Sequence, residues 1–370
     1  MFLISCCLLI LLYLASAVEA QTGGVTATGM SRAFNPAISV NGLFLGAFSS
    51  AAEMEGHDDE HEEHEEGHEE EHTHTHGGTA EGMQVQEVEL QLSSFVDPYL
   101  KADLTLAMHG SEGIELEEGV VTSLALPANL TLKAGKFYAA LGKHNLLHTH
   151  QFPFIRPPLV NEHLLGGHGL NEVGLGLDWL LPIAWYAELS AQVLNGDNSL
   201  FSAPKGEDLA YLGHLKSFWE LGESATLELG GSYATGQNEH ERTTQLAGGD
   251  LTFKWRPVRR AIYRSLTFQV EYLYASMDHG DESEAEGGLY FLSQYQFARR
   301  WWVQGQYDLF GLPKEEEERD HRISGLLAFV PSEFSSFRLQ YSRNETEGEE
   351  FGELFLQFNF TIGSHPAHRY

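Results

Sequence analysis

One stretch near the N-terminus concentrates side chains that bind metal ions. Residues 53–76 contain seven histidines and no lysine or arginine, and twelve acidic residues lie between Glu53 and Glu71. Neutral imidazole and carboxylate are ligands for zinc, nickel and copper, so this composition predicts metal binding. The candidate ligands are His57, His61, His64, His68, His72, His74 and His76.

The spacing of these histidines adds a structural prediction. The first five are separated by four, three, four and four residues, which places them on one helical face roughly 80° wide. At neutral pH the acidic residues repel one another and favour disorder, and a bound dication would offset that charge and fold the segment. The alternative is a solvated acidic loop whose histidines bind metal loosely.

Positioning these residues requires an ordered fold, and the composition supports one. The 370 residues include 42% hydrophobic residues and 38 glycines, and the formal net charge is −31. Such a charge excludes an ordinary nucleic-acid binder, because no basic stripe is available to neutralise phosphates. We therefore expect no nucleic-acid partner.

The N-terminus is typical of an exported protein. Residues 2–18 form an apolar run, and the sequence Ala17-Val-Glu-Ala20 at its end offers the small residues that a signal peptidase recognises. We therefore predict a signal peptide over 1–20. An uncleaved anchor is the alternative, because no lysine or arginine precedes the run. Cys6 and Cys7 lie inside this segment, so the mature chain would offer no disulfide and no thiolate ligand. No later apolar stretch reaches the length of a membrane helix, so any membrane structure would be β.

From Ala37 onward the chain alternates apolar and polar residues, for example in 86–93 and 354–361. This periodicity predicts sixteen strands, over 37–50, 84–97, 100–109, 113–126, 129–143, 172–182, 185–196, 209–219, 225–236, 244–256, 265–277, 288–299, 301–311, 321–330, 335–343 and 351–361. A soluble sandwich would show the same alternation, but the connections discriminate.

Tight turns alternate along the chain with long insertions at 51–83, 144–171, 197–208, 278–287 and 312–320. Short periplasmic turns, long outer loops and an even strand count predict an all-β fold, a closed antiparallel transmembrane β-barrel of about sixteen strands. The expected organisation is a periplasmic segment over 21–36, the barrel over 37–363 and a periplasmic tail over 364–370. The tail carries His365 and His368, which would face the periplasm. There they would either transfer metal onward or only cap the last strand.

Aromatic and basic residues divide the two ends of the predicted barrel. All six tryptophans lie within a few residues of the short turns, as expected for an interfacial belt; they are Trp179, Trp185, Trp219, Trp255, Trp301 and Trp302. Arginines gather at the same end, near 256–264 and 299–300, whereas the long loops are acidic.

Three segments carry a family resemblance in addition to the His-rich stretch. They are Phe-Asn-Pro-Ala-Ile-Ser at 34–39, Lys-Phe-Tyr-Ala-Ala-Leu-Gly-Lys-His-Asn at 136–145 and the closing residues 356–370. With them the chain resembles bacterial outer-membrane porins, in particular the phosphate-selective-porin-like group and porin-sized proteins described as zinc-regulated TonB-dependent outer-membrane receptors. The resemblance implies an outer-membrane location, a homotrimer and a periplasmic energy-coupling partner. The sixteen residues before the first strand are too few for the plug domain of a true receptor, and no energy-coupling box is evident there.

The resemblance also gives a role to the loop over 144–171, because the third outer loop of a porin often folds into the lumen. The candidate pore residues are His144, His148, His150, Glu162, His163 and His168. Imidazoles and a carboxylate at a constriction could form a transient cation site. Alternatively, these histidines are solvent-exposed loop residues, or Arg156 makes the loop select anions.

The sequence gives no catalytic motif outside the His-rich stretch: it contains no Gly-x-Ser-x-Gly and no phosphate-binding glycine loop. Zincin-like spacing of histidine and glutamate, as at 60–64, lies inside the low-complexity acidic run, where such matches are expected by chance. We expect a protein that is not an enzyme and requires no cofactor, with zinc or another divalent metal as its ligand. The predicted function is an outer-membrane channel or receptor that takes up small solutes, above all divalent metal cations. The alternatives are a non-conducting metal-binding protein, a partner-energised receptor, and a general or anion porin.

Overall fold

The computed structural model describes residues 36–51, 81–110, 113–202, 208–278, 280, 283–346 and 348–363. The predicted signal peptide, the seven histidines from His57 to His76 and the tail over 364–370 lie outside the described residues.

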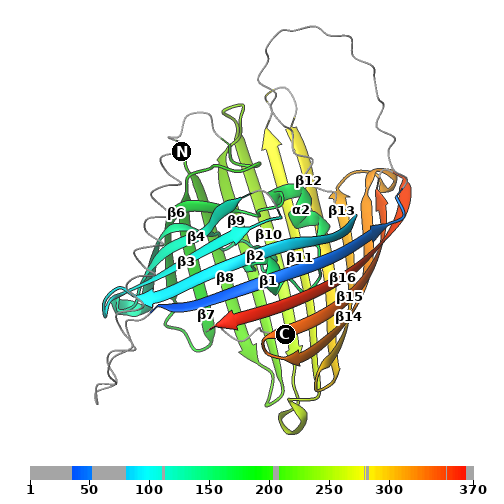
Figure 1. Cartoon of the computed structure of the whole chain (residues 1–370). Coiled ribbons are helices and arrows are strands. Elements are labelled where there is room, and N and C mark those ends of the chain that lie inside the picture. The colour runs from blue at the N-terminus through cyan, green and yellow to red at the C-terminus, as the bar shows by residue number, and fades with distance from the viewer. Residues whose placement is uncertain are drawn as a thin grey trace, which may run out of the picture.

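Sixteen strands form one closed barrel in which each strand pairs antiparallel with its sequence neighbours. Ser39 of β1 lies opposite Gly363 of β16, and Ser49 lies opposite Glu353, so the first and last strands close the barrel (Figure 1). The predicted barrel and its strand number are confirmed. The strands are β1 (Ala37–Ser49), β2 (Gly82–Phe95), β3 (Leu100–Met108), β4 (Ile114–Ser123), β5 (Leu130–Tyr138), β6 (Asn171–Leu180), β7 (Tyr186–Leu194), β8 (Ala210–Glu220), β9 (Ala225–Gln237), β10 (Thr243–Trp255), β11 (Ser265–Asp278), β12 (Ser283–Ala298), β13 (Trp301–Leu312), β14 (Asp320–Ser332), β15 (Ser335–Thr346) and β16 (Glu349–Gly363).

The strands separate an apolar outer face from a polar lumen. In β13 the side chains of Trp301, Val303 and Tyr307 are exposed on the outer face, whereas Gln304 and Gln306 are buried in the lumen. Trp302 follows the same alternation and is 8% exposed, so it points inward and does not join the interfacial belt. The reason is the period of two, which sends adjacent residues to opposite faces of a strand.

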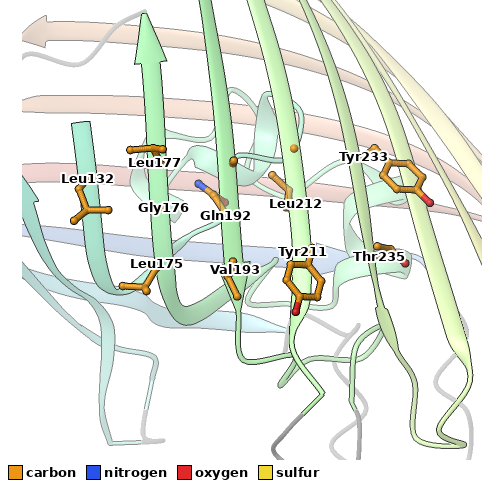
Figure 2. A pocket seen from close by; sticks show the side chains of 12 residues that line it. Leu132, Leu175, Gly176, Leu177, Gln192, Val193, Tyr211, Leu212, Tyr233 and Thr235 are labelled. Carbon is orange, nitrogen blue, oxygen red and sulfur yellow. The ribbon is translucent and has the colours of Figure 1, made fainter. Parts of the chain in front are cut away.

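The outer face is hollowed over β5 to β9. A depression of about 540 Å³ is lined by side chains such as Leu175, Leu177, Tyr211 and Tyr233, with Gly176 between the two leucines (Figure 2). Leu175 and Tyr211 are more than half exposed. Apolar, exposed side chains are what a lipid-facing barrel surface requires.

The connection between β5 and β6 lies inside the barrel, and we call residues 139–170 the lumen loop. It contains three short helices, η3 (His144–Leu146), η4 (Thr149–Gln151) and α2 (Leu159–Leu165). Helix α2 lies beside β12 and β13 (Figure 1) and packs against β11, β12 and β13. Its Val160 and Leu164 join a buried cluster with Leu292 and Phe310. The apolar side of the loop therefore forms a small hydrophobic core within the lumen.

Arginines from the barrel wall hold the other parts of the lumen loop. Arg322 of β14 donates to the carbonyl oxygen of Pro157, and Arg338 of β15 donates to the carbonyl oxygens of Phe152 and Pro153. Each of these bonds joins residues that are distant in sequence, so the loop is fixed to the strands at its middle and not only at its ends.

The remaining helices are the short turns η2 (Pro127–Asn129), η5 (Val258–Arg260) and η6 (Glu316–Glu318). Within the described part of the chain, no helix combines the length and the apolar character needed to cross a bilayer.

Candidate metal centre in the lumen

Acidic and histidine side chains meet where the lumen loop contacts β2 and β4. Glu87 and Glu89 come from β2, Glu117 from β4, and His148 and His150 from the loop. We call these five residues the lumenal cluster. All of them are buried, and Glu87 and Glu89 are each only 1% exposed.

Local backbone structure brings these side chains together. Glu87 and Glu89 are two residues apart in a strand and therefore share its lumenal face. In β4 the register slips: Thr105 lies opposite Glu118 and Leu106 lies opposite Leu116, which leaves Glu117 as the extra residue of a β-bulge. A bulge redirects side chains, and here both Glu117 and Glu118 contact the same histidine, His148.

The two imidazoles are set by the η4 turn. Gln151 N donates to the carbonyl oxygen of His148 at 2.8 Å, which closes a tight turn around Thr149 and His150. The His148 and His150 rings lie nearly parallel, with centroids 5.8 Å apart and an interplanar angle of 26°. Both imidazoles therefore reach toward the carboxylates of β2 and β4.

The distances between the candidate ligand atoms suit a small cation. His148 Nδ1 lies 3.1 Å from Glu117 Oε2 and 3.3 Å from Glu89 Oε2, and His150 Nδ1 lies 3.0 Å from Glu89 Oε2. A tetrahedral zinc ion with ligands at 2.0–2.1 Å would hold its ligand atoms about 3.3 Å apart. The described residues thus present imidazole nitrogens and carboxylate oxygens at the spacing of a zinc coordination shell.

A surrounding layer of contacts orients the lumenal cluster. The Nε2 atom of His148 lies 3.1 Å from Glu118 Oε2, Tyr138 donates its hydroxyl to Glu117 Oε1, and His109 Nε2 lies 3.2 Å from Glu87 Oε2. Metal-binding histidines usually bond a carboxylate through their second nitrogen, which fixes the ring orientation. His148 shows this arrangement.

Two glutamates of β2 in the lumenal cluster each have one carboxylate oxygen without a hydrogen-bond donor from the part of the chain that the structure describes. Among the residues that the structure describes, Oε1 of Glu87 and Oε1 of Glu89 are buried without a hydrogen-bond donor. Leaving a buried charged acceptor unpaired is costly. A bound cation would supply the missing interaction.

The electrostatics of the lumenal cluster favour positive charge. Burial by itself lowers the pKa of His148, but hydrogen bonds to Glu117, Glu118 and Glu89 outweigh it and raise that pKa well above its ordinary value. The hydrogen bond to Glu87 likewise raises the pKa of His109. Several carboxylates within a buried site therefore attract either protons onto the imidazoles or a metal cation.

A cavity of about 350 Å³ adjoins the lumenal cluster. Its lining includes Glu117 and Tyr138 at the buried end and the more exposed Glu115 and His168. His168 Nδ1 lies 3.7 Å from Glu115 Oε2, and its ring lies edge-on to His109 with centroids 5.9 Å apart. The predicted pore residue His168 thus lines an approach to the cluster that contains His148 and His150.

The other three predicted pore residues make different contacts. His144 packs on Phe152 with ring centroids 4.4 Å apart, and burial, helped by repulsion from Arg322, lowers its pKa to about 3. Glu162 is paired with Arg156 and Arg322. His163 stacks on Phe310, with ring centroids 4.3 Å apart, and its Nε2 lies 3.5 Å from Asp320 Oδ2. These three side chains stabilise the lumen loop and lie outside the lumenal cluster.

Sequence reasoning missed the three carboxylates of the cluster. Glu87 and Glu89 are polar residues of a strand that alternates apolar and polar side chains. Assigning the polar residues of each predicted strand to the lumen could therefore have found them. Glu117 had no such signal, because its position depends on the bulge in β4.

Comparisons with solved structures place the fold among outer-membrane proteins. OmpTΔL8, a loop L8 deletion mutant of the outer-membrane protein OmpT of Vibrio cholerae, superposes with a TM-score of 0.58 and 7% identity, over 89% of this chain and 100% of that one. The anion-selective porin from Comamonas acidovorans gives 0.57 and 10% over the same shares. The outer-membrane channel DcaP of Acinetobacter baumannii gives 0.56 and 11% over 89% and 96%. The protein therefore has the porin-like β-barrel fold of these bacterial outer-membrane proteins.

Sequence comparison gives a relative as well. The chain is 33% identical to an uncharacterized protein of Aquifex aeolicus (strain VF5) over 333 aligned positions, which cover 78% of this chain and 70% of that protein. No family model matches the chain. The chain belongs to the same family as the Aquifex protein.

Proposed function

We propose that this protein is an outer-membrane channel for divalent metal cations such as zinc. The observation that carries the proposal is the lumenal cluster, in which buried imidazoles and carboxylates lie 3.0–3.3 Å apart beside a loop that occupies the barrel interior. Conduction requires sites that bind an ion strongly enough to admit it and weakly enough to release it.

The path of a cation would run from the acidic outer loops to the lumenal cluster. Glu315, Glu316 and Glu318 in one outer loop raise the local cation concentration, and the histidines from His57 to His76 would capture metal. The cavity that contains His168 and Glu115 then leads to Glu117. Release would deliver the ion to the periplasm, where an energy-coupling partner is not required for a passive channel.

An anion or general porin is the second candidate, favoured by the three arginines near the lumen loop. Arg156 lies 3.0 Å from Glu353, Arg322 pairs with Asp308 and Glu162, and Arg338 donates to Gln357 and to loop carbonyl oxygens. Because their charges are directed at carboxylates and the loop backbone, we place cation passage first. Reversal potentials in a potassium chloride gradient discriminate between the two, since the acidic mouth predicts cation preference.

Zinc influx into proteoliposomes that contain the full barrel tests the proposal. The test variant is His148→Ala/His150→Ala, and the matched control is His240→Ala/His321→Ala, which removes two imidazoles outside the lumenal cluster. We expect zinc influx to fall at least tenfold in the test variant and to stay unchanged in the control. A variant lacking residues 57–76 measures the contribution of the His-rich segment in the same assay.

Three results would contradict the proposal in different ways. Equal zinc influx in the test and control variants would remove the lumenal cluster from the transport path. Anion-selective reversal potentials would favour the second candidate. An absence of zinc influx in the unaltered protein would favour a non-conducting metal-binding protein or a receptor driven by a partner. None of these results depends on whether the protein is a monomer or the homotrimer that the porin resemblance implies.

A further inference from the structure

We infer that the lumenal cluster binds two divalent cations at once, with the carboxylate of Glu89 bridging them. This inference rests on the proposed function, because it specifies how the same cluster would hold the transported metal. It differs from that function in predicting a number of ions and the identity of the residue that they share.

The described ligand atoms fall into two sets of three. One set is Glu87, Glu89 and His150, and the other is Glu89, Glu117 and His148; within each set the ligand atoms lie within 4.8 Å of one another. Every member is buried. Each set contains one imidazole, and Glu89 is the member common to both.

The geometry of Glu89 fits a bridging role. Its Oε2 atom lies 3.0 Å from His150 Nδ1 and 3.3 Å from His148 Nδ1, so one oxygen faces both imidazoles. Its Oε1 atom is buried without a hydrogen-bond partner among the described residues. A carboxylate can bind one ion through each of its two oxygens. Bridging of this kind is found in two-metal sites, where the ions lie about 3.5–4 Å apart.

Each ion would also have a carboxylate of its own. Glu117 Oε2 lies 3.1 Å from His148 Nδ1, and its Oε1 accepts from Tyr138, so the two oxygens have separate tasks. Glu87 bonds His109 through Oε2 at 3.2 Å, and its Oε1 is buried and unpartnered within the described structure. In both residues one oxygen is bonded by the protein, which leaves the other available to an ion.

The charge of the site also fits two dications. Glu87, Glu89, Glu117 and Glu118 carry four negative charges when ionised, and Glu118 contacts His148 at 3.1 Å. One dication leaves half of this buried charge uncompensated, whereas two dications balance it. Uncompensated buried charge is unfavourable.

Two adjacent ions would also assist release. Cations that share one carboxylate repel each other, so arrival of the second weakens retention of the first. Multi-site binding of this kind allows ions to leave a site that attracts them strongly. Zinc influx is then expected to rise more steeply than linearly with zinc concentration while the second site fills.

The test combines zinc stoichiometry with location in the full-length protein. Zinc bound at equilibrium is measured by metal analysis in the unaltered chain and in variants, so that ions held elsewhere, including the His-rich segment, cancel in the differences. We expect Glu89→Gln to lose two ions, and His150→Ala and His148→Ala to lose one ion each. The matched control Glu188→Gln, a carboxylate that pairs with Lys216 and lies outside the lumenal cluster and its cavity, is expected to lose none. Circular dichroism checks that each variant retains the barrel.

Anomalous scattering at the zinc edge locates the ions independently. We expect two peaks, one beside His148 and one beside His150, separated by about 3.5–4 Å. A single peak, or the loss of only one ion in Glu89→Gln, would overturn the bridged pair. Two bound ions in a protein without zinc influx would instead refute the proposed function and leave the two-ion site standing.

Discussion

Replacing Arg322 by methionine should release the lumen loop. The Arg322 side chain is 1% exposed; its Nε lies 3.4 Å from Asp308 Oδ2, and its Nη1 lies 3.3 Å from Glu162 Oε2. It also donates to the carbonyl oxygen of Pro157. The substitution therefore leaves Asp308 of the wall and Glu162 of the loop without their shared cation.

The size of the effect follows from these contacts. Removing one partner of a buried ion pair costs about 3–5 kcal/mol. Gln306 still donates to both oxygens of Asp308, and Arg156 still pairs with Glu162, so the lower end of that range applies. Undocking the loop would hydrate both carboxylates and relieve the penalty, and about 3 kcal/mol shifts the docked-to-undocked ratio by roughly 100-fold.

Maleimide labelling of a cysteine on the loop measures this ratio. Leu159→Cys places a thiol at a buried position of α2, and Cys6 and Cys7 are the sequence's own cysteines, both within the predicted signal peptide. When labelling is slow relative to opening, its rate reports the open fraction. We expect Arg322→Met to raise the labelling rate roughly 100-fold and to increase single-channel conductance.

The control is Arg343→Met on β15. Arg343 is exposed and pairs with Glu350, which is also exposed. This variant should label at the unaltered rate. If Arg322→Met labels no faster than the control, the arginine does not hold the loop, and the hydrophobic contacts of α2 alone must do so.

Three further predictions concern the loop and the wall. Gly142 has a φ of 57°, and a Cβ there would lie 2.0 Å from Glu271 Oε1, so Gly142→Ala should speed Leu159→Cys labelling by displacing the start of the loop; unchanged labelling would contradict this. Burial lowers the pKa of His144 to about 3, whereas the pKa of an unfolded histidine is about 6.5. As pH falls below about 6.5 the unfolded chain takes up a proton that the native state does not, so the native state loses about 1.4 kcal/mol of stability at pH 5.5. Denaturant unfolding at pH 7.5 and 5.5 should show a smaller loss in His144→Phe, and an equal loss would refute the assignment. Leu215 faces lipid in the middle of β8, so Leu215→Arg should destabilise the barrel by about 2–4 kcal/mol in the same measurement, and a neutral effect would place that face away from lipid.

The alternation of side chains predicted the strands, and the alternation of short turns with long loops distinguished a barrel from a sandwich, because both rules repeat along the whole chain. Two strand boundaries differed most from their predicted positions, by five residues each. Strand β5 ends at Tyr138 where the alternation suggested residue 143, because the following residues enter the lumen loop. Strand β12 begins at Ser283 where the alternation suggested residue 288. There Glu284 and Glu286 are charged and Ala285 is small, so the outer end of the strand lacks the apolar half of the pattern. Charged strand ends above the membrane are indistinguishable from loops by periodicity alone.

The candidate site was predictable only in part. His148 and His150 were recognised as histidines of the loop that the porin resemblance places in the lumen. Their neighbour His144 carries the same chemistry and is instead buried against Phe152. Which histidine meets a carboxylate depends on the path of the lumen loop through the barrel and on the bulge at Glu117. Both are long-range features that no local pattern reports.

The anchoring of the lumen loop has a consequence for the order of assembly. The loop follows β5, yet three of its anchors, Arg322, Arg338 and Glu353, belong to β14, β15 and β16. These strands are synthesised last, and β16 also pairs with β1 to close the barrel. The lumen loop can therefore make its full set of contacts only after β14, β15 and β16 are in place. A chain truncated before β14 would lack these contacts as well as the closure of the barrel.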